Sequence, residues 1–270
     1  MDDKAAINFY KMQGLGNDFI LIDSRSEKLN GLDLKKLAIG ICDRNFGVGA
    51  DGLLIVHPSQ KAHYRMQVIN SDGSEPEMCG NGIRCFARYV YETDKLKEEV
   101  ISVETLAGII VPAIIKGADG GISMIEVDMG IPKDEGMVNL AGFDFKKISM
   151  GNPHAITFLD DETYGNIDLS EIGPLIEHDP HFINRTNVEF TRVISENRIE
   201  IKVWERGAGA TLACGTGACA AAAAGFILGL IGRHVEVHLP GGALDIEWGD
   251  DQHILMRGPA EFVFEGKYYL

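Results

Sequence analysis

The sequence predicts an α+β protein with two pseudo-symmetric domains that derive from an internal duplication. Two similar segments, Cys79-Gly80-Asn81-Gly82 and Cys214-Gly215-Thr216-Gly217, lie 135 residues apart in a chain of 270. A stretch with helical spacing follows each segment, and runs of strand character flank both helices. An order that repeats at half the chain length indicates two equivalent domains rather than a solenoid. We expect each domain to be a curled, mixed or antiparallel sheet around one central helix.

In the first half, a strand that begins at Asn8 leads into a turn at Gly14-Leu15-Gly16. Apolar residues at helical spacing predict helices over Leu32–Asp43 and Gly80–Glu92. The remaining strands are expected at Phe19–Ile22, Leu53–His57, Tyr64–Ile69, Ile101–Glu104, Ile109–Ile115 and Met124–Met129.

In the second half, helices are expected over Asp168–Glu177 and Gly215–Leu228, with Gly229 as the stop signal of the latter. The strands are expected at Ile148–Phe158 with a turn inside it, Val188–Val193, Arg198–Trp204, Val235–Leu239, Leu244–Trp248, Ile254–Arg257 and Ala260–Phe264. We therefore assign residues 1–123 to an N-terminal domain and 124–259 to a C-terminal domain. The last strand, in 260–270, is expected to join the first domain.

The composition excludes some classes of partner. A net charge of −15 argues against nucleic acid and disfavours an anionic membrane surface. No signal peptide is visible at the N-terminus. The uncharged stretch Gly207–Gly232 consists mostly of Gly, Ala and Thr, which predicts a tightly packed buried helix rather than a membrane span. We expect a small-molecule substrate and neither a nucleic acid nor a membrane partner.

The five cysteines are an odd number without a Cys-x-x-Cys pair, which does not fit a disulfide scaffold and favours the reducing cytoplasm. We interpret Cys42, Cys85 and Cys219 as core residues. Cys79 and Cys214 differ, because the start of a helix offers free N–H groups and partial positive charge that acidify a thiol and bind a carboxylate. They are therefore candidate catalytic residues, and the alternative is two structural cysteines beside turn glycines.

Three other motifs carry no site. The stretch from Gly47 to Gly52 fits GxGxxG, but a helix precedes it and a strand follows, the reverse of a dinucleotide site. The loop His178-Asp179-Pro180-His181 lacks a third ligand nearby, so we expect no metal. The acidic run Asp160-Asp161-Glu162 is interpreted as a solvated turn.

Polar loops lead into both cysteine segments. They are Asn70–Ser74 and Glu205-Arg206-Gly207, and two further loops contain Asn152 with His154 and Thr186 with Asn187. Each residue alone would be a turn or a helix cap. Together with two thiols, they suit recognition of the charged groups of an amino acid.

The chain resembles the diaminopimelate epimerase family. The residues that carry the resemblance span nearly the whole chain: Gly14–Phe19, Asn70–Ser74, Cys79–Cys85, Met150–His154, Glu205–Gly209 and Ala213–Ala218. The resemblance implies interconversion of LL- and meso-diaminopimelate without pyridoxal or another cofactor, on the route to lysine and bacterial cell-wall precursors. It also implies a homodimer and two similar barrel-like domains with the site in the cleft between them.

By the same resemblance, Cys79 and Cys214 match the catalytic pair, and His154 and Glu205 match residues that assist the thiols. The substrate-binding set comprises Asn17, Asn70, Asn152, Asn187, Glu205 and Arg206, with the backbone of Gly80, Asn81, Gly215 and Thr216 as a carboxylate cradle. Two positions depart from the family pattern: Gly52, where relatives often have glutamine, and Ala210, where they usually have glutamate.

The expected chemistry uses one cysteine as thiolate to remove the α-proton and the other as thiol to protonate the opposite face. Two alternatives stay open. A related racemase would act on proline-like substrates by the same logic, although Glu205-Arg206 and the asparagines suit a substrate with distal charges. A thiol-based redox or ligand-binding protein would work through a Cys79–Cys214 disulfide.

Overall fold

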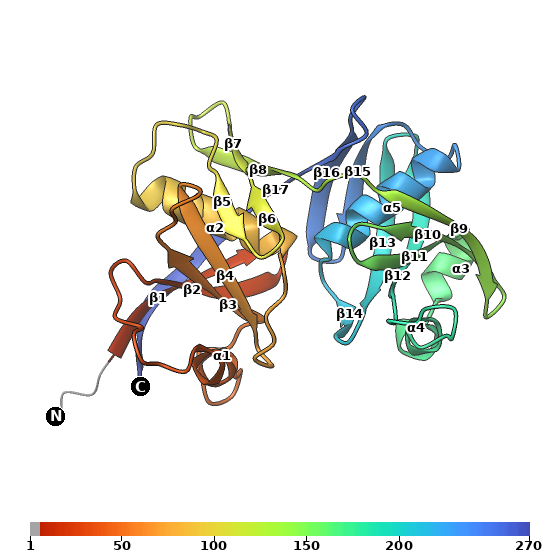
Figure 1. The fold of residues 1–270 in the computed structure, drawn as a ribbon. Helices are drawn as coiled ribbons and strands as arrows, with labels where there is room; N and C mark the ends of the chain where they lie inside the picture. The colour runs from red at the N-terminus through yellow and green to blue at the C-terminus, as the bar shows by residue number, and fades with distance from the viewer. Residues whose placement is uncertain (1–5) are drawn as a thin grey trace. The chain divides into compact units, whose positions relative to one another are not determined.

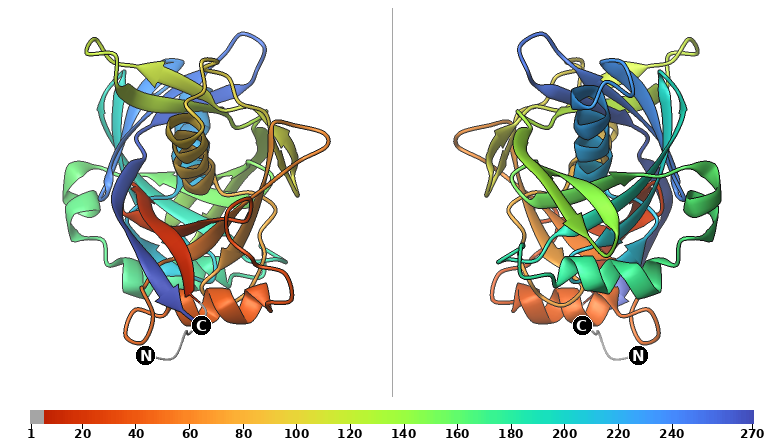
Figure 2. Two further views of the ribbon diagram at one scale, coloured as in Figure 1. Left: turned by 90° about the vertical axis from the view of Figure 1, so that its left-hand side faces the viewer. Right: turned by 90° about the vertical axis from the view of Figure 1, so that its right-hand side faces the viewer.

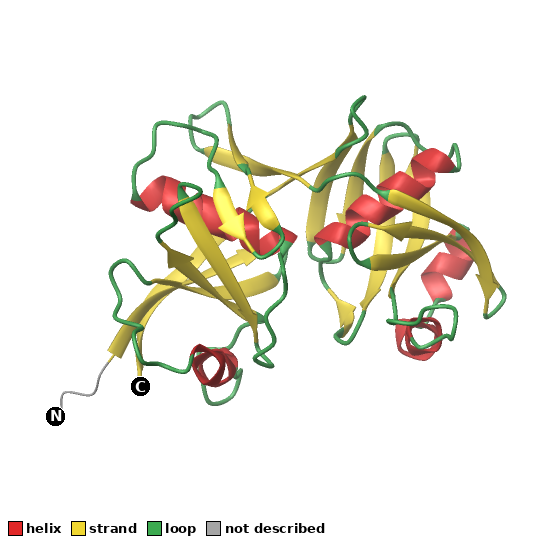
Figure 3. Ribbon diagram, viewed as in Figure 1, coloured by secondary structure: helices red, strands yellow, loops and turns green. Residues whose placement is uncertain are grey.

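The structure is a computed structural model that describes residues 6–270. The chain divides into two compact units, one ending at Val127 and completed by Gly258–Leu270, the other formed by Asp128–Arg257. Strands dominate both units, and helices are few (Figure 3). The predicted α+β class is confirmed.

The first unit contains a seven-stranded sheet in the order β18-β1-β2-β3-β4-β5-β6. The strands are β1 (Ala6–Gly14), β2 (Asn17–Asp23), β3 (Gly52–His57), β4 (Tyr64–Asn70), β5 (Val103–Thr105), β6 (Gly108–Ile110) and β18 (Glu261–Tyr269). A hairpin of β7 (Ala113–Lys116) and β8 (Ile122–Asp128) follows β6 in the chain. The helices are α1 (Leu34–Cys42) and α2 (Gly80–Thr93).

In the second unit the strand order is β17-β16-β15-β13-β12-β11-β10-β9, and β14 pairs with β13. The strands are β9 (Lys133–Leu140), β10 (Phe143–Ser149), β11 (Pro153–Phe158), β12 (Asn187–Ser195), β13 (Arg198–Glu205), β14 (Gly209–Thr211), β15 (His234–Leu239), β16 (Gly242–Trp248) and β17 (Ile254–Gly258). The helices are α3 (Asp161–Asn166), α4 (Leu169–Glu177) and α5 (Gly215–Ile227).

Both units follow one plan of strand pairing, which confirms the duplication. In the first, β1 and β2 form an antiparallel hairpin, β2 runs parallel to β3, β3 antiparallel to β4, β4 parallel to β5, and β5 antiparallel to β6. In the second, β10, β11, β12, β13, β15 and β16 pair in the same alternation. The strands of the first parallel pair are connected in the chain by α1 in one unit and by α3 and α4 in the other. The strands of the second parallel pair are connected by α2 and by α5.

The sheets are curled but open. Within the described residues, β18 and β6 are the ends of the sheet of the first unit and β9 is an end of the sheet of the second, so the barrel-like domains that the family resemblance implied are not closed barrels. Within each unit the long helix lies in the curve of its own sheet: α2 contacts β1–β4, and α5 contacts β10–β13, β15 and β16 (Figures 1 and 2).

The two central helices are buried for different reasons. α5 is rich in alanine and buried nearly all round, as small side chains on every face allow strands to approach from all sides. α2 carries a fully buried Arg84, whose guanidinium donates to the carbonyl oxygens of Pro259 at 3.1 Å and Gly80 at 3.4 Å. Arg84 thereby ties α2 to the segment that enters β18.

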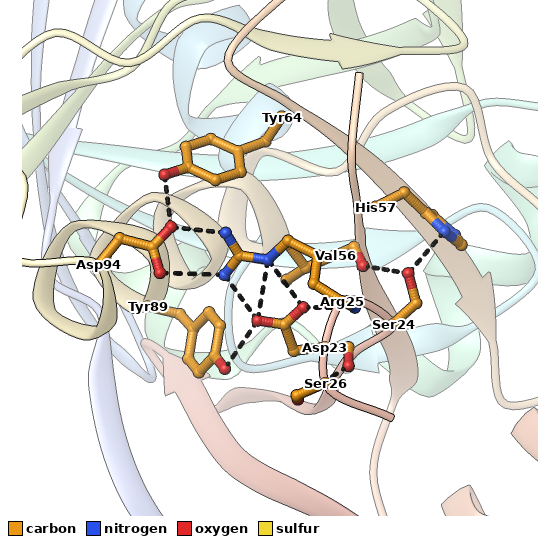
Figure 4. Close-up of polar contacts among 9 residues, drawn as sticks. All are labelled: Asp23, Ser24, Arg25, Ser26, Val56, His57, Tyr64, Tyr89 and Asp94. Atoms are coloured by element: carbon orange, nitrogen blue, oxygen red, sulfur yellow. Dashed lines mark hydrogen bonds and ion pairs between the residues drawn. The ribbon is translucent and has the colours of Figure 1, made fainter. Parts of the chain in front are cut away.

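A second arginine fixes the far end of α2 (Figure 4). Arg25, just after β2, pairs with Asp23 at 2.6 Å and with Asp94, the C-cap of α2, at 2.5 Å. Tyr64 donates its hydroxyl to Asp94 at 2.7 Å, and Tyr89 donates to Asp23 at 3.2 Å. The pKa of Arg25 is raised by its hydrogen bonds to the two carboxylates, foremost that to Asp23. Both ends of α2 are therefore anchored within its own unit.

The structure corrects several predicted elements. The single strand predicted at Ile109–Ile115 is two strands, β6 and β7, because Pro112 has no N–H to donate to a ladder. The acidic run at 160–162 begins α3, where Asp160 is the N-cap and accepts from the backbone N–H of Thr163 at 2.8 Å. β9 and most of β10 were not expected, and β18 extends to Tyr269.

Three expectations about single segments fit the structure. Cys42, Cys85 and Cys219 are buried, and none of the five cysteines is in a disulfide. The GxGxxG stretch is a loop before β3. Within residues 6–270, no helix combines the length and the apolar character needed to cross a bilayer.

Candidate functional site

Cys79 and Cys214 occupy the same local structure in the two units. Each is the extended N-cap of a central helix, with φ, ψ of −136°, 117° for Cys79 and −128°, 108° for Cys214. Each sulfur accepts a hydrogen bond at 3.4 Å from the backbone N–H three residues on, which belongs to Gly82 or Gly217. The sulfur thus takes the place of the oxygen of the usual Ser or Asp cap. As predicted, both thiols lie at helix N-termini.

In the first unit, Asn17 lies beside Cys79 in a fixed orientation. Its Nδ2 donates to Asp51 Oδ2 at 2.7 Å, and its Oδ1 accepts from Asn81 Nδ2 at 3.1 Å. The same Oδ1 lies 4.0 Å from Cys79 Sγ. A carboxylate only accepts hydrogen bonds, so Asp51 determines which end of the Asn17 amide faces the thiol.

A charged network holds Asp51. Arg44 donates to Asp51 and to Asp18, both at 2.8 Å, and Lys11 pairs with Asp18 at 2.5 Å. Burial acts to raise the pKa of Asp18, but hydrogen bonds from Arg44 and Lys11 outweigh it and hold the pKa below its usual value. The backbone carbonyl of Asp51 also accepts from Ser71 N at 3.0 Å, which links this network to the loop before Cys79.

Asn70 closes that loop on itself. Its Nδ2 donates to Ser74 Oγ at 2.9 Å, and its backbone N–H donates to the Ser74 carbonyl at 2.8 Å. In the described structure its side chain therefore supports the loop that leads to Cys79.

In the second unit, a chain of contacts runs from Cys214 to a buried carboxylate. Cys214 Sγ lies 3.6 Å from Thr216 Oγ1, which accepts from Asn152 Nδ2 at 3.3 Å. Asn152 Oδ1 lies 3.0 Å from Nε2 of His154, whose Nδ1 lies 2.7 Å from Glu189 Oε1. The side chains of His154 and Glu189 are both 0% exposed.

Glu205 adds a second carboxyl group beside Cys214. Burial raises the pKa of Glu205, against hydrogen bonds from Thr211, at 2.5 Å, and from Cys214. Burial, followed by the charges of Glu205 and Glu189, raises the pKa of Cys214 well above its usual value. The pKa of Cys214 thus shifts in the direction opposite to the one that the helix N-terminus alone would give, because desolvation and two nearby acids outweigh the helix dipole.

Asn187 organises the loop that contains Arg206. Its Oδ1 accepts from the backbone N–H of Arg206 at 2.9 Å, and its Nδ2 donates to the Pro153 carbonyl at 3.0 Å. The Arg206 side chain is exposed and donates to the Asn184 carbonyl at 3.2 Å. Its guanidinium is thus accessible to an anionic group.

Sequence reasoning missed several residues of these clusters, among them Glu189, Asp51 and Thr211. Glu189 lies within a predicted strand, and an acid at a position expected to be buried was the available signal. Asp51 lies in the stretch that was set aside as a loop. Thr211 follows Ala210, and nothing in its local pattern indicated its bond to Glu205. Among residues 6–270, no group of three or more His, Cys, Asp and Glu side chains is placed to hold a metal ion.

Comparison with known sequences identifies the family. The family model described as Diaminopimelate epimerase matches residues 9–133 and 147–263. The chain belongs to the diaminopimelate epimerase family. The diaminopimelate epimerase of Moorella thermoacetica is 49% identical over 98% of this chain and all of its own length. That of Carboxydothermus hydrogenoformans is 48% identical with the same coverage. The protein is accordingly an isomerase of the epimerase type.

Solved structures share the fold at low identity. A phenazine biosynthesis protein of the PhzF family from Bacillus anthracis has a TM-score of 0.76 at 16% identity, covering 98% of this chain and all of its own. A hydroxyproline epimerase from Agrobacterium vitis has a TM-score of 0.69 at 14% identity, covering 100% of this chain and 94% of its own. These likenesses confirm the two-repeat architecture of the diaminopimelate epimerase family member described here.

Proposed function

We propose that the protein interconverts LL- and meso-diaminopimelate without a cofactor, and that Cys79 and Cys214 transfer protons on opposite faces of one α-carbon. The observation that carries the proposal is that each thiol caps the central helix at the same point of a duplicated unit. Inversion at carbon requires removal of a proton from one face and delivery to the other. A duplicated thiol site offers one group for each task.

In the proposed step, one cysteine as thiolate takes the α-proton and becomes a thiol. The electron pair of the broken C–H bond moves into the α-carboxylate. The other cysteine, as thiol, gives its proton to the opposite face and becomes a thiolate. The two sulfurs finish with exchanged protonation states, and the reverse reaction uses them in exchanged roles.

The negative charge that develops on the substrate needs stabilisation. The backbone N–H groups of Gly80, Asn81, Gly215 and Thr216 lie at the first turns of α2 and α5, where helix dipoles favour an anion. Loss of one such donor in a comparable site costs about 3 kcal/mol.

The surroundings of the thiols support distinct starting states. A raised pKa keeps Cys214 a thiol at rest, so Cys214 would act first as the proton donor. Before the reverse reaction, Cys214 would pass its proton to Glu205, to which it is hydrogen-bonded, and Cys79 would take up a proton from solvent, so that each sulfur starts in the exchanged state. His154 would assist the thiol chemistry through Asn152.

Substrate recognition is proposed for Asn17, Asn70, Asn152, Asn187 and Arg206. The exposed guanidinium of Arg206 suits a distal carboxylate, which diaminopimelate has and proline lacks. A cytoplasmic homodimer that serves lysine biosynthesis completes the proposal.

Deuterium incorporation from heavy water tests it. Wild type should incorporate α-deuterium into LL-diaminopimelate and form the meso isomer, while Cys79→Ala and Cys214→Ala should lose at least about 100-fold in rate. Cys219→Ala, a buried thiol in the alanine-rich α5, is the matched control and should remain active. Absence of exchange in reduced wild type would refute the reaction, and full activity of either site variant would refute the two-cysteine mechanism.

A further inference from the structure

The two units differ in chemistry at one pair of equivalent positions. An offset of 135 residues relates Cys79 to Cys214, and it also relates the strands beside them. Phe19 pairs with Gly52 between β2 and β3, while His154 pairs with Asn187 between β11 and β12. The first unit therefore has Phe19 where the second has His154.

The neighbouring position shows the same change. Leu54 of β3 and Glu189 of β12 are related by the same offset, and each lies against the first turn of its central helix. A Cβ on Gly82 would lie 3.2 Å from Leu54 Cδ2, and one on Gly217 would lie 2.6 Å from Glu189 Oε1. The apolar pair of the first unit is thus replaced by a buried acid and imidazole in the second.

Stability alone does not explain this replacement. Both polar side chains are 0% exposed, and within residues 6–270 nothing hydrogen-bonds Oε2 of Glu189. A buried carboxyl oxygen without a partner is unfavourable. Replacing a buried ionic pair by well-packed apolar residues is often neutral or stabilising. The first unit already shows that Phe and Leu fit these positions of the fold.

The contact geometry indicates what the pair does. Glu189 Oε1 lies 2.7 Å from Nδ1 of His154, and the other ring nitrogen faces Asn152 at 3.0 Å. A carboxylate at Nδ1 holds the proton on that nitrogen and fixes the orientation of the ring, as the aspartate does in Ser-His-Asp sites. The other nitrogen faces the amide oxygen of Asn152, which can only accept, so Nε2 is the donor of that contact, and Asn152 in turn donates to Thr216 beside Cys214.

We propose that Glu189 is a positioning residue that keeps a proton on Nδ1 of His154 and holds its imidazole in one orientation. Through it, the second unit acquires a proton-handling group that its duplicate lacks. This inference rests on the proposed function, in which His154 assists the thiols.

The charged and titratable groups around Glu189 predict a second effect. They are His154 on β11, Glu205 on β13 and Cys214 at the start of α5. The charge of Glu189 contributes to the raised pKa of Cys214, so its removal should make this thiol react at lower pH.

The test compares Glu189→Leu, Glu189→Gln and the double variant His154→Phe/Glu189→Leu, which copies the residues of the first unit. Glu200→Gln, on β13 of the same sheet, controls for loss of a carboxylate elsewhere. Nitrogen-15 NMR of the ring should show Nδ1 of His154 protonated in wild type and without its proton in Glu189→Leu. Glu189→Leu should lose about 10- to 100-fold in kcat for deuterium exchange, with KM little changed.

The other variants separate positioning from packing. Glu189→Gln keeps an acceptor without the charge and should fall between wild type and Glu189→Leu. The double variant should be as inactive as Glu189→Leu, yet melt at or above the wild-type temperature. In Glu189→Leu and the double variant, Cys214 should be alkylated at lower pH than in wild type, as followed by peptide mapping.

Three results would overturn the inference: an Nδ1 of His154 that stays protonated in Glu189→Leu, activity within about twofold of wild type, or an unchanged alkylation profile of Cys214. If Glu189→Leu does not fold, the double variant decides through its activity and alkylation profile. If wild type shows no exchange at all, the proposed function fails, whereas NMR and alkylation still test the role of Glu189.

Discussion

Substitution of Gly217 by alanine probes how tightly the second unit is built around Glu189. A Cβ at this position would lie 2.6 Å from Glu189 Oε1, 3.2 Å from Cys214 Sγ and 3.3 Å from Cys214 Cβ. The first distance is far inside normal contact, so the carboxylate must move. That movement breaks its 2.7 Å contact with His154, where both partners are buried.

The expected change in the free energy of unfolding is the sum of one stabilising and two destabilising effects. Alanine in place of glycine inside a helix gains about 0.5–1 kcal/mol. Overpacking costs about 1–3 kcal/mol, and an unsatisfied buried polar group costs about another 1–3 kcal/mol. We expect Gly217→Ala to destabilise the protein by about 2–4 kcal/mol on these terms.

Gly82→Ala is the matched control, since Gly82 follows Cys79 as Gly217 follows Cys214. Its Cβ would meet only the flexible end of Leu54, at 3.2 Å, and Cys79 at 3.3 Å or more. The higher helix propensity of alanine and the mild overpacking then nearly cancel, so the free energy of unfolding should change by no more than about 1 kcal/mol.

Urea unfolding measures both variants. Trp204 and Trp248 are the chain's two tryptophans and belong to the second unit, so their fluorescence follows that unit, while circular dichroism follows the whole chain. The reasoning would be refuted if Gly217→Ala were as stable as wild type. It would also be refuted if Gly82→Ala lost as much free energy of unfolding as Gly217→Ala.

Three further outcomes are expected. Asp51→Ala removes the acceptor that orients the amide of Asn17, so kcat/KM should fall about tenfold. Arg44→Gln leaves the Asp51 carboxylate in place, so its kcat/KM should fall less. Steady-state kinetics that rank the two variants in the opposite order would contradict this. The pKa of Glu205 is raised in the fold, chiefly by burial, so its stabilising neutral form is lost as pH rises from 4.5 through that pKa. Glu205→Gln should therefore melt higher than wild type at pH 8 and show no such advantage below pH 4.5, and a lower melting temperature at pH 8 would count against it. Although burial acts to raise it, the pKa of Glu177 is lowered by hydrogen bonds from Trp204 and the backbone of Gly207. Its stabilisation is present above pH 4.5 and lost on acidification, so Glu177→Gln should flatten the acid limb of a stability profile, and an unchanged limb would exclude this contribution.

The features that local pattern determines were predictable from the sequence. The Cys-Gly segments and the helical spacing after them located both N-capping thiols, and their spacing revealed the duplication. The small, uncharged residues of Gly207–Gly232 correctly predicted a tightly packed, buried helix, which is α5. These features depend on residues close together in the chain, where propensity and periodicity act directly.

Long-range contacts were not predictable in this way. Glu189 acquires its meaning only when β12 lies beside β11 and its carboxylate reaches His154. The upward direction of the pKa shift of Cys214 could not be predicted, because the helix dipole is local, whereas the desolvation and the carboxylates that outweigh it come from the surrounding sheet. β9 was missed because its side chains are mostly exposed and carry little apolar alternation.

The pairing of β18 with β1 bears on how the protein is made. The first unit is discontinuous: its sheet is completed by Glu261–Tyr269, which leave the ribosome after the whole of the second unit. The second unit is contiguous and is complete in the nascent chain before the first. During synthesis the edge of β1 therefore stays unpaired until Glu261–Tyr269 have been translated and can complete the sheet of the first unit.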